Sequence, residues 1–211
     1  MKELIIVGAG GFGREAYYVA KAINAVQEQW IIKGFIDDDL HALDGIKCGI
    51  GIIGRISDWV PSENEEFAMG IAGPSAKKTC SSILEAKGAR FINLIHPLAL
   101  FNEDAEIGRG CVISARSSVG AGTEVGNFVH IAGSMIGQDA VIGDYSTTTG
   151  YANLTNAYIG EGVFIGSHAV ILNKRKVGDY AYVCAGSIVM SNVKAGTKVF
   201  GNPAKRIDTN F

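Results

Sequence analysis

The chain has little charge, few cysteines and no long uninterrupted hydrophobic run. Only 19% of its 211 residues are charged, and 19 basic residues nearly balance 21 acidic ones. It therefore lacks the basic surplus of a general nucleic-acid-binding protein. No apolar run approaches the ~20 residues of a membrane span. The apolar start is broken at once by glycines, which predicts a first strand rather than a signal peptide.

Cysteine and histidine are too scattered to form a metal centre. The four cysteines form no C-x-x-C pair: Cys48, Cys80, Cys111 and Cys184. This usage predicts reduced thiols in a cytoplasmic protein rather than a disulfide framework or a zinc site. The four histidines are likewise too dispersed for a three-histidine site. We therefore expect no metal.

The first part of the chain alternates strands and helices. Apolar runs predict strands at 4–7, 31–36, 67–71 and 89–94, and helical spacing predicts helices at 12–25 and 74–87. This alternation predicts a small parallel α/β sheet.

After His96-Pro97 the pattern becomes a repeat with a six-residue period. Aliphatic residues recur in phase, with slips by one residue, at Ile107, Ile113, Val119, Val125, Ile131, Ile136, Ile142, Ile159, Ile165, Ile171, Val177, Val183 and Val189. Glycine often follows the aliphatic residue, and a small residue stands three positions further on. Short strands joined by tight turns, each coil covering the last, predict a parallel β-helix. We therefore divide the chain into domains 1–95 and 96–211.

This repeat resembles that of the hexapeptide-repeat acyltransferases, in which three hexapeptides make one triangular coil of a left-handed β-helix. The resemblance extends to the closing run GNPAKRI, at 201–207, which is a familiar ending of coenzyme A-dependent members. The handedness is implied by the resemblance and not by the periodicity.

The glycines near the start have two interpretations. Gly8, Gly10 and Gly13 match G-x-G-x-x-G between a strand and a helix, as in dinucleotide sites. Alternatively, the glycines only close a βα turn. The front part is about half of a doubly wound sheet, which disfavours an NAD-dependent enzyme. A nucleotide-linked ligand still fits, because a helix N-terminus offers N–H groups to phosphate.

A half-Rossmann unit joined to a hexapeptide β-helix resembles the NeuD/PglD-like sugar acetyltransferases of bacterial surface glycan synthesis. The matching pieces are IIVGAGGFGRE, GFIDDD, GIGIIGRISDW, AMGIAGP, IHPLA and VFGNPAKRI. The resemblance implies an enzyme that acetylates a nucleotide-linked amino sugar or a sialic acid, with a front domain that binds the nucleotide part of the sugar donor. It also implies acetyl-CoA bound along the β-helix between the subunits of a homotrimer. The implied nucleotide-sugar contacts are Gly8, Gly10, Gly11, Phe12, Asp37 and Asp38.

The catalytic position departs from this family, which usually has a histidine followed by an acidic residue. Here Gln138 occupies the histidine position in the run IGQDAVIGDY, with Asp139 behind it. A second family histidine is replaced by Thr147. A glutamine amide has no useful basicity near pH 7, although it donates and accepts hydrogen bonds. The chain is thus an engineered variant, a natural pseudoenzyme, an enzyme with another base, or one that only positions its substrate amine.

His130 is the candidate for a substitute base. The coil register places it directly under Thr147, about 5 Å away, the spacing of paired strands. The alternative is a solvent-facing corner histidine. His168 is a candidate coenzyme or trimer contact, whereas we interpret His96 as structural.

The remaining coenzyme candidates come from small corner residues and a basic tail. Small residues allow the pantetheine arm to approach, and cationic side chains pair with the 3′-phosphate. The predicted coenzyme set is Thr147, Gly150, Gly166, His168, Ala185, Gly186, Lys205 and Arg206. For Lys205 and Arg206 the alternative is a solvated basic tail. The function follows as an acetyl-CoA-dependent sugar acetyltransferase, or as a silent sugar-nucleotide- and coenzyme-binding protein of the same fold.

Overall fold

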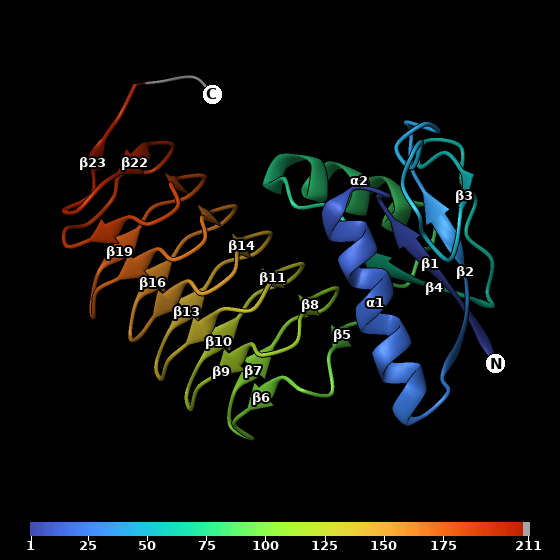
Figure 1. Ribbon diagram of the computed structural model, residues 1–211, viewed down its shortest axis with the longest axis horizontal. Helices are drawn as coiled ribbons and strands as arrows, with labels where there is room; N and C mark the ends of the chain where they lie inside the picture. Colours follow the sequence, from blue (N-terminus) through green and yellow to red (C-terminus); the bar gives the residue numbers. More distant parts are fainter. Residues whose placement is uncertain (209–211) are drawn as a thin grey trace.

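A computed structural model describes residues 1–208 and has two parts, a small α/β domain and a long solenoid (Figure 1). The α/β domain has a parallel sheet in the order β3-β2-β1-β4. Its elements are β1 (Lys2–Val7), α1 (Gly11–Val26), β2 (Trp30–Ile36), β3 (Ile52–Gly54), β4 (Glu65–Met69) and α2 (Pro74–Ala86). The prediction of a small parallel sheet is confirmed. The strand predicted at 89–94 is largely wrong, because in this segment only Phe91 forms an isolated parallel bridge, to Phe67, and Leu94 already belongs to a strand of the solenoid.

Two apolar clusters flank the sheet, one on each face, and both extend to the solenoid. Strand β1 alternates, so that Leu4 and Ile6 belong to one buried cluster while Ile5 and Val7 belong to the other. The first cluster includes the buried residues of α1 and the solenoid residue Val112. The second includes the solenoid residue Phe128. The α/β domain therefore shares its core with the side of the solenoid.

The solenoid has three faces of short, stacked strands. Face 1 contains β7 (Glu106–Ile107), β10 (Glu124–Val125), β13 (Val141–Ile142), β16 (Tyr158–Ile159) and β19 (Lys176–Val177). Face 2 contains β5 (Leu94–Ile95), β8 (Val112–Ile113), β11 (His130–Ile131), β14 (Thr147–Thr148), β17 (Phe164–Ile165), β20 (Tyr182–Val183) and β22 (Lys198–Phe200). Face 3 contains β6 (Leu100–Phe101), β9 (Ser118–Val119), β12 (Met135–Ile136), β15 (Asn153–Leu154), β18 (Val170–Ile171) and β21 (Ile188–Val189).

The six-residue period corresponds to one face per repeat, with the aliphatic residue pointing inward. These aliphatic residues form one buried cluster along the solenoid axis, with Ile107 partly buried at its edge. The stacked strands of the three faces pair in parallel from coil to coil. Leu94–Ile95, placed by our division in the first domain, pairs with β8 and is thus already a solenoid strand. The division itself stays a prediction, and its last three residues, 209–211, lie outside the described part.

The outer surfaces of the three faces differ in chemistry. The first residue of each strand points outward, because the side chains of a strand alternate. On face 1 these residues include Glu106, Glu124 and Lys176. On face 2 the first residues of β5, β8, β11 and β14 are buried, because the α/β domain lies beside these early coils. On face 3 they are uncharged: Leu100, Ser118, Met135, Asn153, Val170 and Ile188.

The end of the solenoid differs from its body. After β22 the chain turns back into β23 (Lys205–Arg206), which pairs with β22 in antiparallel fashion. Within residues 1–208, no helix is long and apolar enough to cross a membrane.

Candidate functional site

The glycine loop, as we name residues 8–12, comprises the turn after β1 and the first two residues of α1. Gly8 has φ +93°, a conformation that favours glycine. A Cβ on Gly13 would collide with the carbonyl of Gly8, so the first turn of α1 packs directly on the loop. Gly10 is the N-cap and supplies no side-chain cap to the helix. The first N–H groups of α1 therefore remain available to an anion.

Two aspartates shape the surroundings of this loop. Asp37 is half-buried, and its two carboxylate oxygens accept hydrogen bonds from the backbone N–H of Ala9 at 2.7 Å and of Asp39 at 2.9 Å. Asp38 is exposed, and its carboxylate accepts from the N–H of Ser57 at 3.0 Å. Asp37 thus stabilises the glycine loop, while Asp38 stabilises the loop that contains Ser57.

His130 lies at the junction of the two parts and is closed to solvent. Its Nε2 is 2.7 Å from the carbonyl oxygen of Met69, and its ring stacks on Phe12 of the glycine loop at 5.5 Å. The predicted pairing with Thr147 is confirmed, and the alternative of a solvent-facing histidine is wrong, because the residue is only 1% exposed. Burial, with a smaller effect of Lys77, holds the pKa of His130 well below 6.5. Its Nδ1 has no hydrogen-bond partner among residues 1–208.

Lys77 of α2 is a buried lysine that sequence reasoning missed. Its ammonium donates to three oxygens of the solenoid: the carbonyls of Phe128 and Ser146, both at 3.0 Å, and the hydroxyl of Thr147 at 2.8 Å. The residue is fully buried, and desolvation lowers its pKa to about 7. Three oxygen acceptors favour the charged form and oppose this shift. The hydrogen bonds of Lys77 therefore link α2 to the solenoid, and they depend on a group that titrates.

Gln138 and Asp139 lie at the exposed corner between faces 3 and 1. Asp139 adopts φ +54°, and its N–H donates to the carbonyl of Ala121. The carbonyl of Gln138 accepts from the N–H of Asn156 at 2.8 Å. A cavity of about 230 Å³ beside this corner is lined in part by Asp139, Asn156 and Lys174. His130 lies on face 2, so the structure does not bring it together with Gln138 in one chain.

Most of the predicted coenzyme residues gather at the corner between faces 2 and 3. Those on this corner are Gly150, Gly166, His168, Ala185 and Gly186. The ring of His168 stacks on Tyr151 at 5.1 Å, and the backbone N–H of His168 donates to the carbonyl of Gly150. Packing between coils also explains the glycine at position 166, because a Cβ there would lie 2.5 Å from the backbone nitrogen of Ala185.

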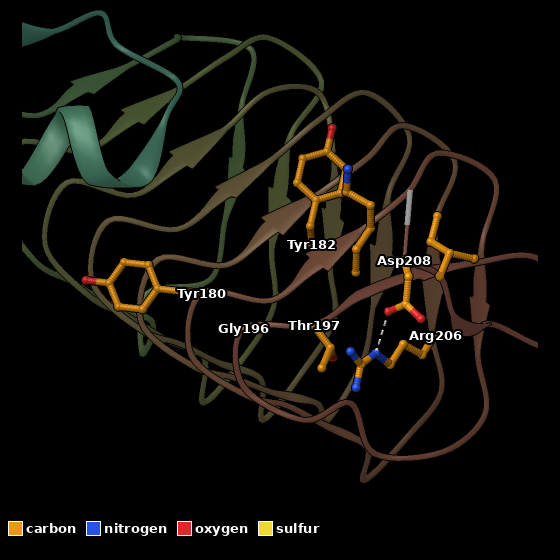
Figure 2. A pocket seen from close by; sticks show the side chains of 8 residues that line it. Tyr180, Tyr182, Gly196, Thr197, Arg206 and Asp208 are labelled. Atoms are coloured by element: carbon orange, nitrogen blue, oxygen red, sulfur yellow. Dashed lines mark hydrogen bonds and ion pairs between the residues drawn. The ribbon is translucent and has the colours of Figure 1, made fainter. Parts of the chain in front are cut away.

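The other predicted coenzyme residues lie elsewhere. Thr147 is buried under α2, where its hydroxyl accepts from Lys77 and donates to the carbonyl of Ala72. The basic tail forms β23, where Arg206 pairs with Asp208 at 3.0 Å, both side chains exposed. Figure 2 shows Arg206 beside Thr197 in a cavity of about 360 Å³. Neither Thr147 nor Arg206 is thus part of the corner at Gly150.

Comparisons with known proteins find similarities to both parts of the chain. A family model described as the PglD N-terminal domain matches residues 3–84. The acetyltransferase domain of PglB from Neisseria gonorrhoeae FA1090 superposes with a TM-score of 0.89 at 25% identity, covering 98% of this chain and 100% of that one. The front part is thus similar to the PglD N-terminal domain, and the whole chain shares the fold of a hexapeptide-repeat acetyltransferase domain. The solenoid matches a left-handed β-helix, as predicted.

Other solved members of this PglD-like fold are similar over the whole chain. WeeI from Acinetobacter baumannii AYE matches with a TM-score of 0.85 at 26% identity, covering 98% of this chain and 100% of that one. PerB from Caulobacter crescentus, solved with CoA and GDP-perosamine, matches with a TM-score of 0.88 at 19% identity, covering 98% of each chain, and shows the fold alone. The PglB domain was also solved in complex with acetyl coenzyme A, with a TM-score of 0.89 at 26% identity, covering 98% of this chain and 99% of that one.

Among curated proteins, matches to bifunctional GlmU proteins are more partial. The protein from Aquifex aeolicus (strain VF5) is 28% identical over 111 residues, which is 52% of this chain and 24% of that protein. The one from Listeria monocytogenes serotype 4a (strain HCC23) is 27% identical over 158 residues, 70% of this chain and 34% of that protein. The chain therefore spans a quarter to a third of the length of these relatives.

Proposed function

We propose that the protein transfers the acetyl group of acetyl-CoA to an amino group of a nucleotide-linked sugar, residues 1–95 binding the nucleotide sugar and residues 96–211 the coenzyme. The observation that carries this proposal is the whole-chain similarity to a PglB acetyltransferase domain that binds acetyl coenzyme A. In the reaction the amine nitrogen bonds to the thioester carbonyl carbon. The carbon–sulfur bond breaks, and the amine proton leaves as free coenzyme A thiol forms.

The nucleotide moiety would bind at the glycine loop. Its phosphates meet the N–H groups at the start of α1, which attract anions. Asp37 keeps this loop in shape through Ala9. Asp38 and Phe12 border the same region, and the contact of Phe12 with His130 couples it to the β-helix.

We further propose a homotrimer that packs through face 3. The outward side chains of this face are uncharged, and Leu100 and Met135 are 71% and 57% exposed in the single chain. Burying such side chains favours association. A threefold axis along face 3 brings the corner that carries Gln138 against the next copy's corner that carries Gly150 and His168. Gln138 and Asp139, which are separate from Gly150 and His168 in one chain, would then meet them between subunits.

A second candidate function is binding of both ligands without turnover. The observation that favours it is Gln138, whose amide is no base, at an exposed corner. In the active enzyme Gln138 would orient the amine by hydrogen bonds, and Asp139 would stand behind it.

The test is to incubate the protein with acetyl-CoA and a panel of nucleotide-linked amino sugars and to follow the release of free thiol. Thiol release that depends on one sugar supports the transferase. Tight binding of acetyl-CoA and a nucleotide sugar without release supports the silent protein. If neither acetyl-CoA nor any nucleotide sugar binds, both candidate functions are contradicted. Light scattering at micromolar concentration tests the trimer, which a monomeric mass would overturn.

A further inference from the structure

A groove of about 270 Å³ lies between α1 and the first coils of the β-helix. One wall is a single face of α1, because Glu15, Tyr18 and Val19 are spaced i, i+3 and i+4. The other wall is the corner between faces 2 and 3 in the first coils, where the chain leaves β5, β8 and β11. That wall consists of His96, Ser114, Ala115, Ala132 and Gly133.

The groove contains a fixed carboxylate without a cation. One oxygen of Glu15 accepts a hydrogen bond from the hydroxyl of Ser114, which is 7% exposed. This bond orients the carboxylate across the junction of the two domains. Among residues 1–208, no lysine, arginine or histidine forms an ion pair with Glu15. A partly buried carboxylate of this kind is suited to a cationic or N–H-donating ligand.

His96 adds a hydrogen-bond donor to the same groove. Its Nδ1 lies 3.0 Å from the backbone nitrogen of Leu98, which can only donate. In the neutral ring the proton is therefore on Nε2, as assigned from this bond. The small side chains of Ala115 and Ala132, together with Gly133, leave space for a ring to lie against the corner. The groove thus combines one acceptor, one donor and a smooth wall.

We propose that this groove binds the sugar ring of the nucleotide-linked substrate, with the carboxylate of Glu15 accepting from the sugar's amino group. The inference rests on the proposed function and specifies its acceptor site. Glu15 is four residues beyond Gly11, about 6 Å along the helix axis. A nucleotide whose phosphates lie at the start of α1 therefore extends its next group, the sugar, along α1 to Glu15.

The proposed trimer places a second group at this groove. Gln138 is in the same coil as Ala132 and Gly133, at the other edge of face 3. Around a threefold axis parallel to the β-helix, Gln138 of a second copy lies at the height of this groove. Glu15 would then hold the amino group from one side while Gln138 orients it from the other.

The proposal makes Glu15 a specificity-determining residue for an amino sugar over a hydroxyl sugar. The test compares the affinities of matched pairs, UDP-glucosamine with UDP-glucose and GDP-perosamine with GDP-rhamnose, by calorimetry in the presence of CoA. Wild-type protein should prefer the amino member of at least one pair. Glu15→Gln should reduce that preference by roughly 10–100-fold, the value of a hydrogen bond to a charged group. Affinities for CoA and for plain UDP or GDP should not change.

Glu28→Gln is the matched control, because it makes the same isosteric change at an exposed residue just beyond α1. It should leave every affinity as in the wild type. If Glu15→Gln unfolds the protein, Ser114→Ala, which only frees the carboxylate, should still weaken the preference several-fold. An unaltered amino preference in a folded variant overturns the inference. Absence of any nucleotide-sugar binding by wild type overturns the proposed function instead.

Discussion

Lys77 is a buried lysine whose titration should be visible in the stability of the protein. Its pKa is about 7 in the folded chain and 10.5 in a solvated lysine, because burial penalises the ammonium. Between these pH values the unfolded chain binds a proton that the folded chain has lost. The free energy of unfolding therefore increases with pH through this window. Lys77→Met removes the titrating group while keeping much of its length.

The magnitude follows from the two pKa values. The slope reaches about 1.4 kcal/mol per pH unit once Lys77 is deprotonated in the folded state. Integrated from pH 7 to pH 9, the gain in stability is about 2 kcal/mol. Above pH 9 the thiols interfere, because burial raises the pKa of Cys111 to about 12 and its retained proton then lowers stability. The useful range is thus pH 7 to 9.

The assay is urea unfolding at pH 7, 8 and 9, at one protein concentration, followed by the fluorescence of Trp30 and Trp59. The stability of wild type relative to Lys77→Met should rise by about 2 kcal/mol across this range. Lys78→Met is the control, because Lys78 is half-exposed and pairs with Glu161 at the surface. Its difference from wild type should stay constant. A constant difference for Lys77→Met as well would refute the reasoning and mean that the three oxygen acceptors keep Lys77 charged.

Three further predictions concern the site. Gln138→His should raise turnover by roughly 10²–10⁴-fold if the chain lacks its base, with coenzyme affinity unchanged; steady-state kinetics check this, and no gain points to another base. Asp37→Ala should weaken nucleotide binding roughly 10–100-fold in calorimetry, since the loop loses its bond at Ala9, while equal loss of coenzyme A binding would contradict the domain assignment. In wild type the depressed pKa of His130 means that below pH 6.5 the unfolded chain binds a proton that the folded chain does not. The free energy of unfolding should therefore fall as the pH falls, by up to about 1.4 kcal/mol per pH unit, and His130→Phe should reduce this slope. An unchanged acid slope would show that His130 does not titrate in this way.

The β-helix could be predicted in detail because each repeat carries its own burial pattern. Ile131 and Ile136 are five residues apart instead of six. Allowing for this shift in the repeat correctly predicted that His130 pairs with Thr147. Such a register depends only on local spacing, since every coil covers the one before it. The parallel sheet of the front domain was predictable for a similar reason, from apolar strands alternating with amphipathic helices.

The junction between the two parts could not be predicted in this way. Lys77 stands beside Lys78 in an amphipathic helix, where two lysines ordinarily indicate a solvated face. Its partners are largely backbone carbonyls, at Phe128 and Ser146, and carbonyls leave no signature in the sequence. Glu15 is similarly inconspicuous, because its partner Ser114 lies 99 residues away. Contacts between domains depend on how the parts dock, which local periodicity does not encode.

The returning strand β23 has a consequence for how copies of this protein can join. A stack of parallel rungs that simply stopped would offer open N–H and C=O groups, onto which another copy could add its first rung and propagate a fibre. On face 2 the last rung, β22, is instead paired with a reversed strand bearing Lys205 and Arg206. At the opposite end of face 2, β5 lies against α1. Growth along the axis is thereby disfavoured, and association is directed sideways, where closed rings of fixed size can form.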